Sequence, residues 1–124
     1  MTIQVGDSIP SVTLYERTPD NKVNTNEFCK GRVIMFGLPG AFTPTCSKDH
    51  VPGFVKLVDE MKKKGVTEVV CLSVNDPYVM AAWGNTLDTA GKIRFLADTH
   101  GEFTKALGMT VDLSSVLGNV RCKR

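Results

Sequence analysis

Short apolar runs alternate with helical patterns along this chain, and this alternation indicates a fold built from both strands and helices. Continuous apolar runs at residues 33–36 and 69–72 predict strands that are buried on both faces, and residues 93–97 predict a third strand. Strands that alternate with helices along a chain are typical of an α/β fold. We therefore expect a central sheet whose strands are at least partly parallel.

A first helix is predicted in the middle of the chain, between the two continuous apolar runs. Phe54, Val58 and Met61 recur at helical spacing. The lysines at 62–64 place positive charge in the last turn, where the helix dipole favours it, and Gly65 can end the helix.

A second helix is predicted after the run at 69–72. Residues 75–77, Asn-Asp-Pro, offer a capping side chain followed by a first-turn proline. Met80, Trp83 and Leu87 supply an apolar stripe at helical spacing. This stripe predicts a helix that packs on the sheet.

Shorter elements are predicted towards both ends. Residues 12–15 and 22–25 read as short strands around a turn at 18–21, and residues 103–107 read as a short helix. There is no internal repeat, low-complexity tract or linker. A single domain over residues 1–124 is therefore expected.

Composition narrows the class of protein. The 124 residues are 42% hydrophobic and 23% charged, which is ordinary for a globular domain with one core. The net charge of +2 is too small to argue for binding to nucleic acid or to a membrane surface. The first residues lack the basic segment and apolar stretch of a secretory signal. The cytoplasm is the expected compartment, with mitochondria and peroxisomes left open.

The four cysteines are dispersed, at positions 29, 46, 71 and 122. No Cys-x-x-Cys occurs, and the two histidines complete no zinc-ligand spacing, so neither a metal nor another cofactor is expected. In a reducing compartment these thiols stay free. Cys29, Cys71 and Cys122 are best read as small buried residues.

The segment around Cys46 has a different character. It follows a predicted strand and opens a helix, with Thr43 as the N-cap and Pro44 at the first helical position. Cys46 then lies in the first turn, where unpaired N–H groups and the helix dipole favour a thiolate. The Thr43 hydroxyl could hydrogen-bond the sulfur or a substrate oxygen. We therefore expect Cys46 to be a nucleophile.

These residues resemble the active-site signature of the peroxiredoxins. Residues 39–47 read Pro-Gly-Ala-Phe-Thr-Pro-Thr-Cys-Ser, which fits Pro-x-x-x-Thr-x-x-Cys. The fuller form, with Gly-Ala-Phe-Thr-Pro, resembles the type II or peroxiredoxin-5 (atypical 2-Cys) group. Further agreeing segments, which extend the resemblance over essentially the whole chain, lie at residues 5–10, 50–54, 71–76, 83–84, 96–98 and 118–124.

The resemblance implies a thioredoxin-like fold, a three-layer α/β/α arrangement around a mixed central sheet. It also implies an antioxidant peroxidase reaction, in which Cys46 attacks hydrogen peroxide or a small alkyl hydroperoxide and becomes a sulfenic acid. By the same match Thr43 orients the peroxide, Pro39 shields the sulfur, and Arg124 supplies the family's arginine. Without the match, Arg124 would be read as a solvated terminal cation. The pocket wall is expected to include Gly40, Phe42 and Thr45.

The chain departs from the family pattern at its end. The family normally continues past this arginine with a strand, a hairpin partner and a final helix, whereas this sequence stops at Arg124. We therefore expect a C-terminally truncated domain that is less stable, and a weaker catalyst, than a longer family member.

The reducing half of the reaction is left open. Cys71, 25 residues after Cys46, matches a resolving position thought to be used in some plant-type members, although its apolar surroundings favour a structural role. The reductant is expected to be thioredoxin, glutaredoxin or glutathione, and a homodimer is expected by resemblance. One alternative is a catalytically impaired chain acting as a dimer partner or redox-sensitive interaction module. A thioredoxin-like disulfide reductase is disfavoured, because Thr43 takes the place of the first cysteine of Cys-x-x-Cys.

Overall fold

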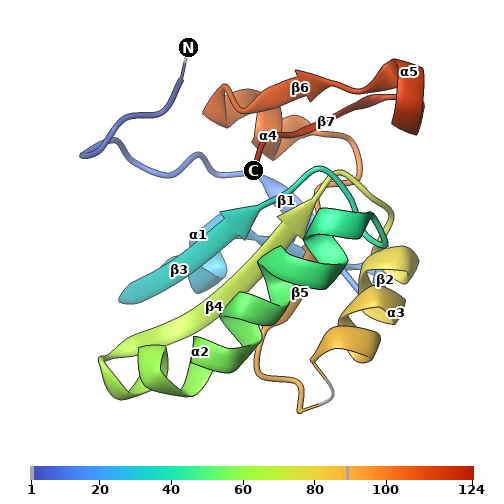
Figure 1. Cartoon of the computed structure of the whole chain (residues 1–124). Helices are drawn as coiled ribbons and strands as arrows, with labels where there is room; N and C mark the ends of the chain where they lie inside the picture. The colour runs from blue at the N-terminus through green and yellow to red at the C-terminus, as the bar shows by residue number, and fades with distance from the viewer. Residues whose placement is uncertain (1, 89) are drawn as a thin grey trace.

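A computed structural model describes residues 2–88 and 90–124 and has a five-stranded central sheet in the order β2-β1-β5-β4-β3 (Figure 1). Strands β3, β4 and β5 are parallel to one another, and β1 runs antiparallel to both of its neighbours. The sheet is therefore mixed, as predicted. The strands span Thr13–Glu16 (β1), Thr18–Asn24 (β2), Arg32–Gly37 (β3), Val66–Ser73 (β4) and Arg94–Ala97 (β5).

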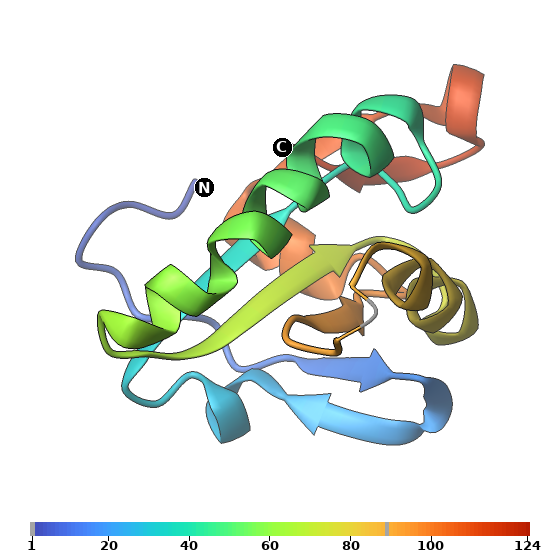
Figure 2. The same cartoon turned by 60° about the horizontal axis from the view of Figure 1, so that its bottom comes forward.

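Helices cover both faces of this sheet, and a small hairpin stands at one end (Figures 1 and 2). Residues of α2 and α3 pack on one face, and residues of α1 and α4 pack on the other. The helices span Thr25–Phe28 (α1), Cys46–His50 (the π-helical segment η1), Val51–Lys63 (α2), Pro77–Leu87 (α3), Glu102–Leu107 (α4) and Ser114–Leu117 (α5), and the hairpin consists of Thr110–Asp112 (β6) and Val120–Cys122 (β7). Within the described residues, no helix has the length and apolar character needed to cross a bilayer.

Strand β4 forms the centre of the core. Its side chains alternate between the two faces, with Val69 and Cys71 in the cluster under α2 and α3. Val70 and Leu72 belong to the cluster under α1 and α4. The prediction of a strand buried on both faces is therefore confirmed for β4.

The same prediction was wrong for β3. This strand lies at the outer position of the sheet and pairs with β4 alone among the described residues. Only Phe36 is buried, while Val33, Ile34 and Met35 are half-exposed. A continuous apolar run reports hydrophobic side chains on both faces, but it carries no information on whether the strand has one neighbour or two.

The predicted turn at 18–21 was also wrong. The chain reverses at Arg17, which has a left-handed φ of 71°, and Glu16 pairs directly with Thr18. Residues 18–21 continue as the start of β2. Pro19 is tolerated there because β2 is the outer strand on that side of the sheet.

The helix boundaries follow the predicted signals. The Asp76 side chain accepts a hydrogen bond from the Val79 N–H at 2.9 Å, and Pro77 begins α3. Helix α2 ends in lysines and is followed by Gly65, whose φ of +94° is in the region that glycine adopts most easily.

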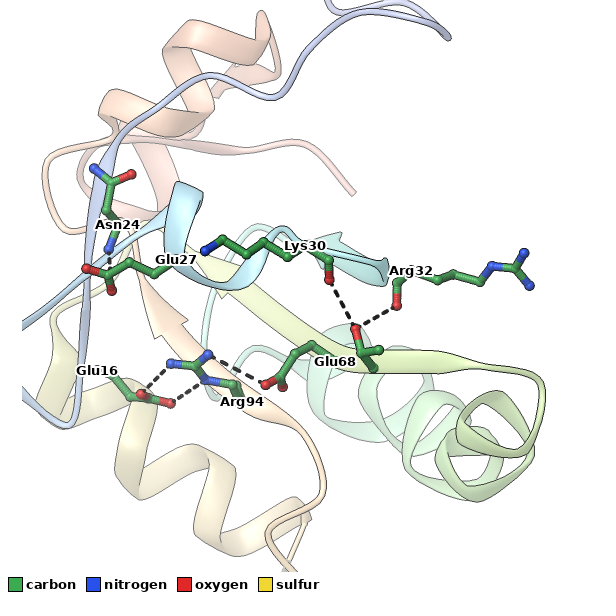
Figure 3. Close-up of polar contacts among 8 residues, drawn as sticks. Glu16, Asn24, Glu27, Lys30, Arg32, Glu68 and Arg94 are labelled. Atoms are coloured by element: carbon green, nitrogen blue, oxygen red, sulfur yellow. Dashed lines mark hydrogen bonds and ion pairs between the residues drawn. The ribbon is translucent and has the colours of Figure 1, made fainter.

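A half-buried ion pair ties β1 to β5, which share a single pair of Cα partners. Figure 3 shows Arg94 between Glu16 and Glu68. The guanidinium lies 2.9 Å from the Glu16 carboxylate and 3.9 Å from that of Glu68. The hydrogen bonds to Glu16 raise the pKa of Arg94. This contact supplements a short stretch of backbone pairing and so helps to hold β1 in the sheet.

Candidate active site

The chain leaves β3, crosses a loop at residues 38–43 and enters a helical segment that carries Cys46 in its first turn. The Ser47 N–H donates to the Thr43 carbonyl at 2.9 Å, so the first helical hydrogen bond closes on Thr43, as predicted. Pro44 is the first residue in helical conformation. The Val51 N–H donates to the Cys46 carbonyl, which gives the wider π-type turn directly after the cysteine.

The Thr43 side chain does not cap the helix as predicted. Its hydroxyl donates to the Gly40 carbonyl at 2.7 Å. A hydroxyl has one proton, so the Thr43 oxygen is left as an acceptor only. It is therefore suited to receive a hydrogen bond from a peroxide O–H rather than to donate one to the sulfur.

Arg124 and Cys46 meet although 78 residues separate them in the sequence. The Arg124 Nη2 atom lies 3.0 Å from Cys46 Sγ, and the cysteine is 0% exposed. A guanidinium is charged at all physiological pH values, so it stabilises a thiolate at this distance. Arg124 is exposed, but this contact gives its guanidinium a specific partner that its sequence position alone did not indicate.

Two side chains far apart in the sequence hold the loop before Cys46. The Arg121 Nη1 donates to the Pro39 carbonyl at 3.3 Å. The Ala41 N–H donates to the Asn75 side-chain oxygen at 3.0 Å, and the Ser73 hydroxyl donates to the same oxygen at 2.7 Å. The loop is thus fixed from β7 on one side and from the end of β4 on the other.

The other predicted pocket residues lie on this loop and in the first helical turn. Gly40 is buried, and a Cβ there would lie 2.9 Å from Arg121 Nη1, so the close approach of the guanidinium requires glycine. Phe42 has a φ of 61° and is 57% exposed, while Pro39 is half-buried and Thr45 is exposed.

Arg124 also lines a cavity that does not include Cys46 among its lining residues. Its volume is about 300 Å³, and it is bordered by β3 and β7 residues together with His50. Gly40, Phe42 and Thr45 do not line it either, so this cavity is separate from the pocket wall predicted around the sulfur.

His50 lies beside the arginine. Its ring packs against Phe36 and Phe54, with centroids 5.3 and 5.6 Å away. Burial, and then the positive charge of Arg124, lower the pKa of His50. The imidazole is therefore held in its neutral form, which leaves Arg124 as the cation beside the sulfur.

The comparisons with known proteins agree with this geometry. Residues 4–124 match the family model described as Redoxin. The curated relative Peroxiredoxin-2B of Arabidopsis thaliana is 45% identical over 126 residues, which cover 98% of this chain and 78% of the relative. The chain belongs to the redoxin family.

Solved structures narrow the group within the redoxins. The crystal structure of peroxiredoxin 5 from Alvinella pompejana matches with a TM-score of 0.92 and 47% identity, over 97% of this chain and 78% of that one. Reduced Prx3 from Vibrio vulnificus in complex with H2O2 matches with a TM-score of 0.88 and 40% identity, over 98% of this chain and 77% of that one. The predicted thioredoxin-like fold and type II peroxiredoxin group are confirmed.

The cysteines of this peroxiredoxin are all free thiols. Cys71 is fully buried in β4, in the same apolar cluster as Cys46. Burial raises the pKa of Cys71 well above its ordinary value, and the neighbouring sulfurs of Cys46 and Cys122 raise it further. Burial also raises the pKa values of Cys29 and Cys122. Among the described residues, no cluster of three or more His, Cys, Asp and Glu side chains could hold a metal ion.

Sequence reasoning missed the residues that hold the loop of this redoxin. A signal for Ser73 and Asn75 was available. Ser73 ends β4 and Asn75 lies just beyond it, and the carboxyl ends of parallel neighbours such as β3 and β4 meet at one edge of the sheet. Arg121 gave no such signal. It reaches Pro39 across 82 residues, and only the packing of the β6–β7 hairpin brings the two together.

Proposed function

We propose that this peroxiredoxin is a thiol-dependent peroxidase in which Cys46 reduces hydrogen peroxide and small alkyl hydroperoxides. The observation that carries the proposal is the 3.0 Å contact between Arg124 Nη2 and Cys46 Sγ, at the first turn of a helix. Family membership and the fold support the same chemistry. Reduced Prx3 from Vibrio vulnificus, to which this chain is similar, has been solved in complex with H2O2, which supports peroxide as the substrate class.

The first step is a two-electron transfer from sulfur to oxygen. The Cys46 thiolate attacks the terminal peroxide oxygen, an S–O bond forms, and the O–O bond breaks. The leaving hydroxide or alkoxide takes up a proton and departs as water or alcohol, while the sulfur becomes a sulfenic acid. The Arg124 guanidinium favours the thiolate before the step and the charge on the breaking O–O bond during it.

The loop residues orient the reaction. The Thr43 oxygen is free to accept a hydrogen bond from the peroxide O–H, because the Thr43 proton is given to Gly40. Pro39 shields the sulfur from bulk water, and Gly40 lets the loop approach Arg121. Phe42 and Thr45 border the entrance in this proposal.

An external thiol reduces the sulfenic acid in this proposal. The reductant thiol attacks the oxidised sulfur, water leaves and a mixed disulfide forms. A second thiol then releases the Cys46 thiolate and carries away a disulfide. Thioredoxin, glutaredoxin and glutathione can each supply such thiols.

Cys71 is a weak internal reductant. Its pKa is raised well above that of an ordinary thiol, and only a thiolate attacks efficiently. Ladder pairs to Phe36 and Phe95 hold its backbone in the middle of the sheet, so the movement that a bridge to Cys46 needs has to come mainly from the Cys46 segment.

The exposed aromatic residues near the loop support a homodimer. Phe42 is 57% exposed and adopts a left-handed conformation, and Tyr78, in the first turn of α3, is 61% exposed. Large exposed aromatics are enriched at protein interfaces. A Phe42→Asp variant should therefore sediment as a monomer under conditions in which the parent chain is a dimer. A parent chain that is monomeric at all concentrations would rule the dimer out.

The proposed function is tested by locating the oxidised sulfur. The reduced protein is treated with one equivalent of H2O2 in the presence of dimedone, which labels sulfenic acids, and the peptides are analysed by mass spectrometry. The label is expected on Cys46 and should be absent from the Cys46→Ser variant. Equal labelling of Cys29 and Cys46 would show that Cys46 has no special reactivity and would contradict the proposal.

A further inference from the structure

A second cavity lies away from the Cys46 sulfur, beyond the carboxyl ends of β4 and β5. Its volume is about 470 Å³. Residues that follow β4 and β5, the start of α4 and the β6–β7 hairpin enclose it. In α/β sheets this edge is where ligands bind most often. The size suits a ligand of several heavy atoms.

The wall of this cavity is basic. His100, Lys105 and Arg121 line it, and no carboxylate is among its lining residues. Asp98 is close in sequence, but it is buried and its oxygens accept hydrogen bonds from the N–H groups of residues 103 and 104 and from the Thr104 hydroxyl. The Asp98 carboxylate is thus already hydrogen-bonded to the start of α4.

The charge of Arg121 has no counterion among the residues that the structure describes. Its guanidinium is half-buried and donates to three neutral oxygens, those of the Asn119 side chain and of the Leu117 and Pro39 carbonyls. None of the ion pairs recorded for the described residues involves Arg121. A half-buried cation without an opposite charge is stabilised by an anion.

An unpaired hydroxyl lies in the same wall. The Thr99 hydroxyl oxygen is buried and has no hydrogen-bond partner. Buried polar groups are satisfied in the great majority of cases, and Thr99 itself is only half-buried, so a rotation of its side chain would bring the orphan hydroxyl to an acceptor in the cavity. The Thr99 hydroxyl can donate to an oxygen atom, as Lys105 and Arg121 can.

We propose that this cavity binds a small oxyanion, the phosphate or carboxylate group of a soluble ligand, between Lys105, Arg121 and Thr99. Binding would also be felt at the active-site loop, because the Arg121 guanidinium donates to the Pro39 carbonyl. The Pro39 carbonyl and the Gly40 N–H belong to the same peptide unit, so a change in this hydrogen bond is expected to shift the Gly40 amide signal. The site does not depend on peroxidase chemistry, so it can be tested without turnover.

The test is a titration of the Cys46→Ser variant followed by amide NMR. The two probes are inorganic phosphate and glutathione methylated at sulfur, and sodium chloride at matched ionic strength is the control. Saturable shifts are expected for the amides of residues 99–101 and 119–121 and for Gly40, with half-saturation below about 10 mM. Saturation by phosphate assigns a phosphate ligand, and saturation by the methylated glutathione alone assigns a carboxylate.

Two single-charge variants locate the site. Lys105→Ala should weaken binding by about 3- to 10-fold, because it removes one of the cations that line the cavity. Lys56→Ala removes an equal charge from the exposed surface of α2 and should leave binding unchanged. Shifts that chloride reproduces, or an equal loss in both variants, would overturn the proposal.

Discussion

Replacing Gly37 by alanine tests how closely the end of the chain is fitted to the sheet. Gly37 is the last residue of β3, and a Cβ at this position would lie 2.7 Å from the Cys122 sulfur. An ordinary contact between such atoms is about 3.5–4.0 Å, so the new methyl group overlaps the sulfur by roughly 1 Å. Cys122 is buried and lines the cavity beside Arg124, so relief of the overlap involves the segment that carries the arginine.

The overlap has two consequences. Overpacking of this kind costs about 1–3 kcal/mol, so the free energy of unfolding should fall by about 2 kcal/mol. Any shift of Cys122 also moves Arg124, two residues further on, relative to Cys46. A misplacement of about 1 Å at a reacting centre can slow it by on the order of 100-fold, so Cys46 oxidation should slow as well.

Urea unfolding gives the first quantity, and stopped-flow oxidation by H2O2 gives the second. Gly53→Ala is the matched control, because Gly53 lies within α2 and an added Cβ meets no atom within 4 Å. It should stabilise the chain by about 0.5–1 kcal/mol without changing the oxidation rate. Adding Cys122→Ala to Gly37→Ala should recover most of the lost stability. If Gly37→Ala lowered the free energy of unfolding equally in the parent chain and in the Cys122→Ala chain, the reasoning would be refuted.

Four further predictions concern the site and its neighbouring groups. Arg124→Met should slow Cys46 oxidation by about 100- to 1000-fold, measured by stopped flow, whereas an unchanged rate would show that the guanidinium takes no part. The same variant should raise the pKa of His50, measured by NMR titration, because the charge of Arg124 lowers it; a constant pKa would place the charge elsewhere. Because the folded-state pKa of His50 is lowered, the unfolded chain binds the proton more readily, and stability should be lost as pH falls below 6.5, with a smaller loss in His50→Gln. Since burial raises the pKa of Cys71, iodoacetamide should label Cys71 only in denaturant, and labelling of the native protein would reveal opening of β4.

Much of the fold could be predicted because its larger elements carry their own local signals. Residues 69–72 of β4 form an uninterrupted apolar run, and α3 has an aspartate cap, a proline and an apolar stripe. The small elements α1, α5, β6 and β7 were missed because each has only three or four residues and carries little periodicity. The β6–β7 hairpin exists through pairing and packing that no local pattern reports.

The candidate site likewise has features that the sequence could predict and features that it could not. The position of Cys46 in a first helical turn follows from Thr43 and Pro44, whose effects are local. Arg124 was named only through the family resemblance, since a contact across 78 residues leaves no trace in spacing. The bond from the Thr43 hydroxyl to the Gly40 carbonyl was not predicted, because only the folded loop brings this carbonyl near enough to compete for the single proton.

The most direct test of the central assignment is the rate at which H2O2 oxidises Cys46 in the fully reduced chain. The Trp83 Nε1–H donates to the Ser47 hydroxyl at 2.9 Å, so tryptophan fluorescence provides a reporter one residue from the sulfur. We predict a second-order rate constant above about 10⁴ M⁻¹s⁻¹, within the range of enzymes, and loss of the signal in Cys46→Ser. A rate no faster than that of free cysteine under the same conditions would contradict the assignment of Cys46 as the peroxide-reducing sulfur.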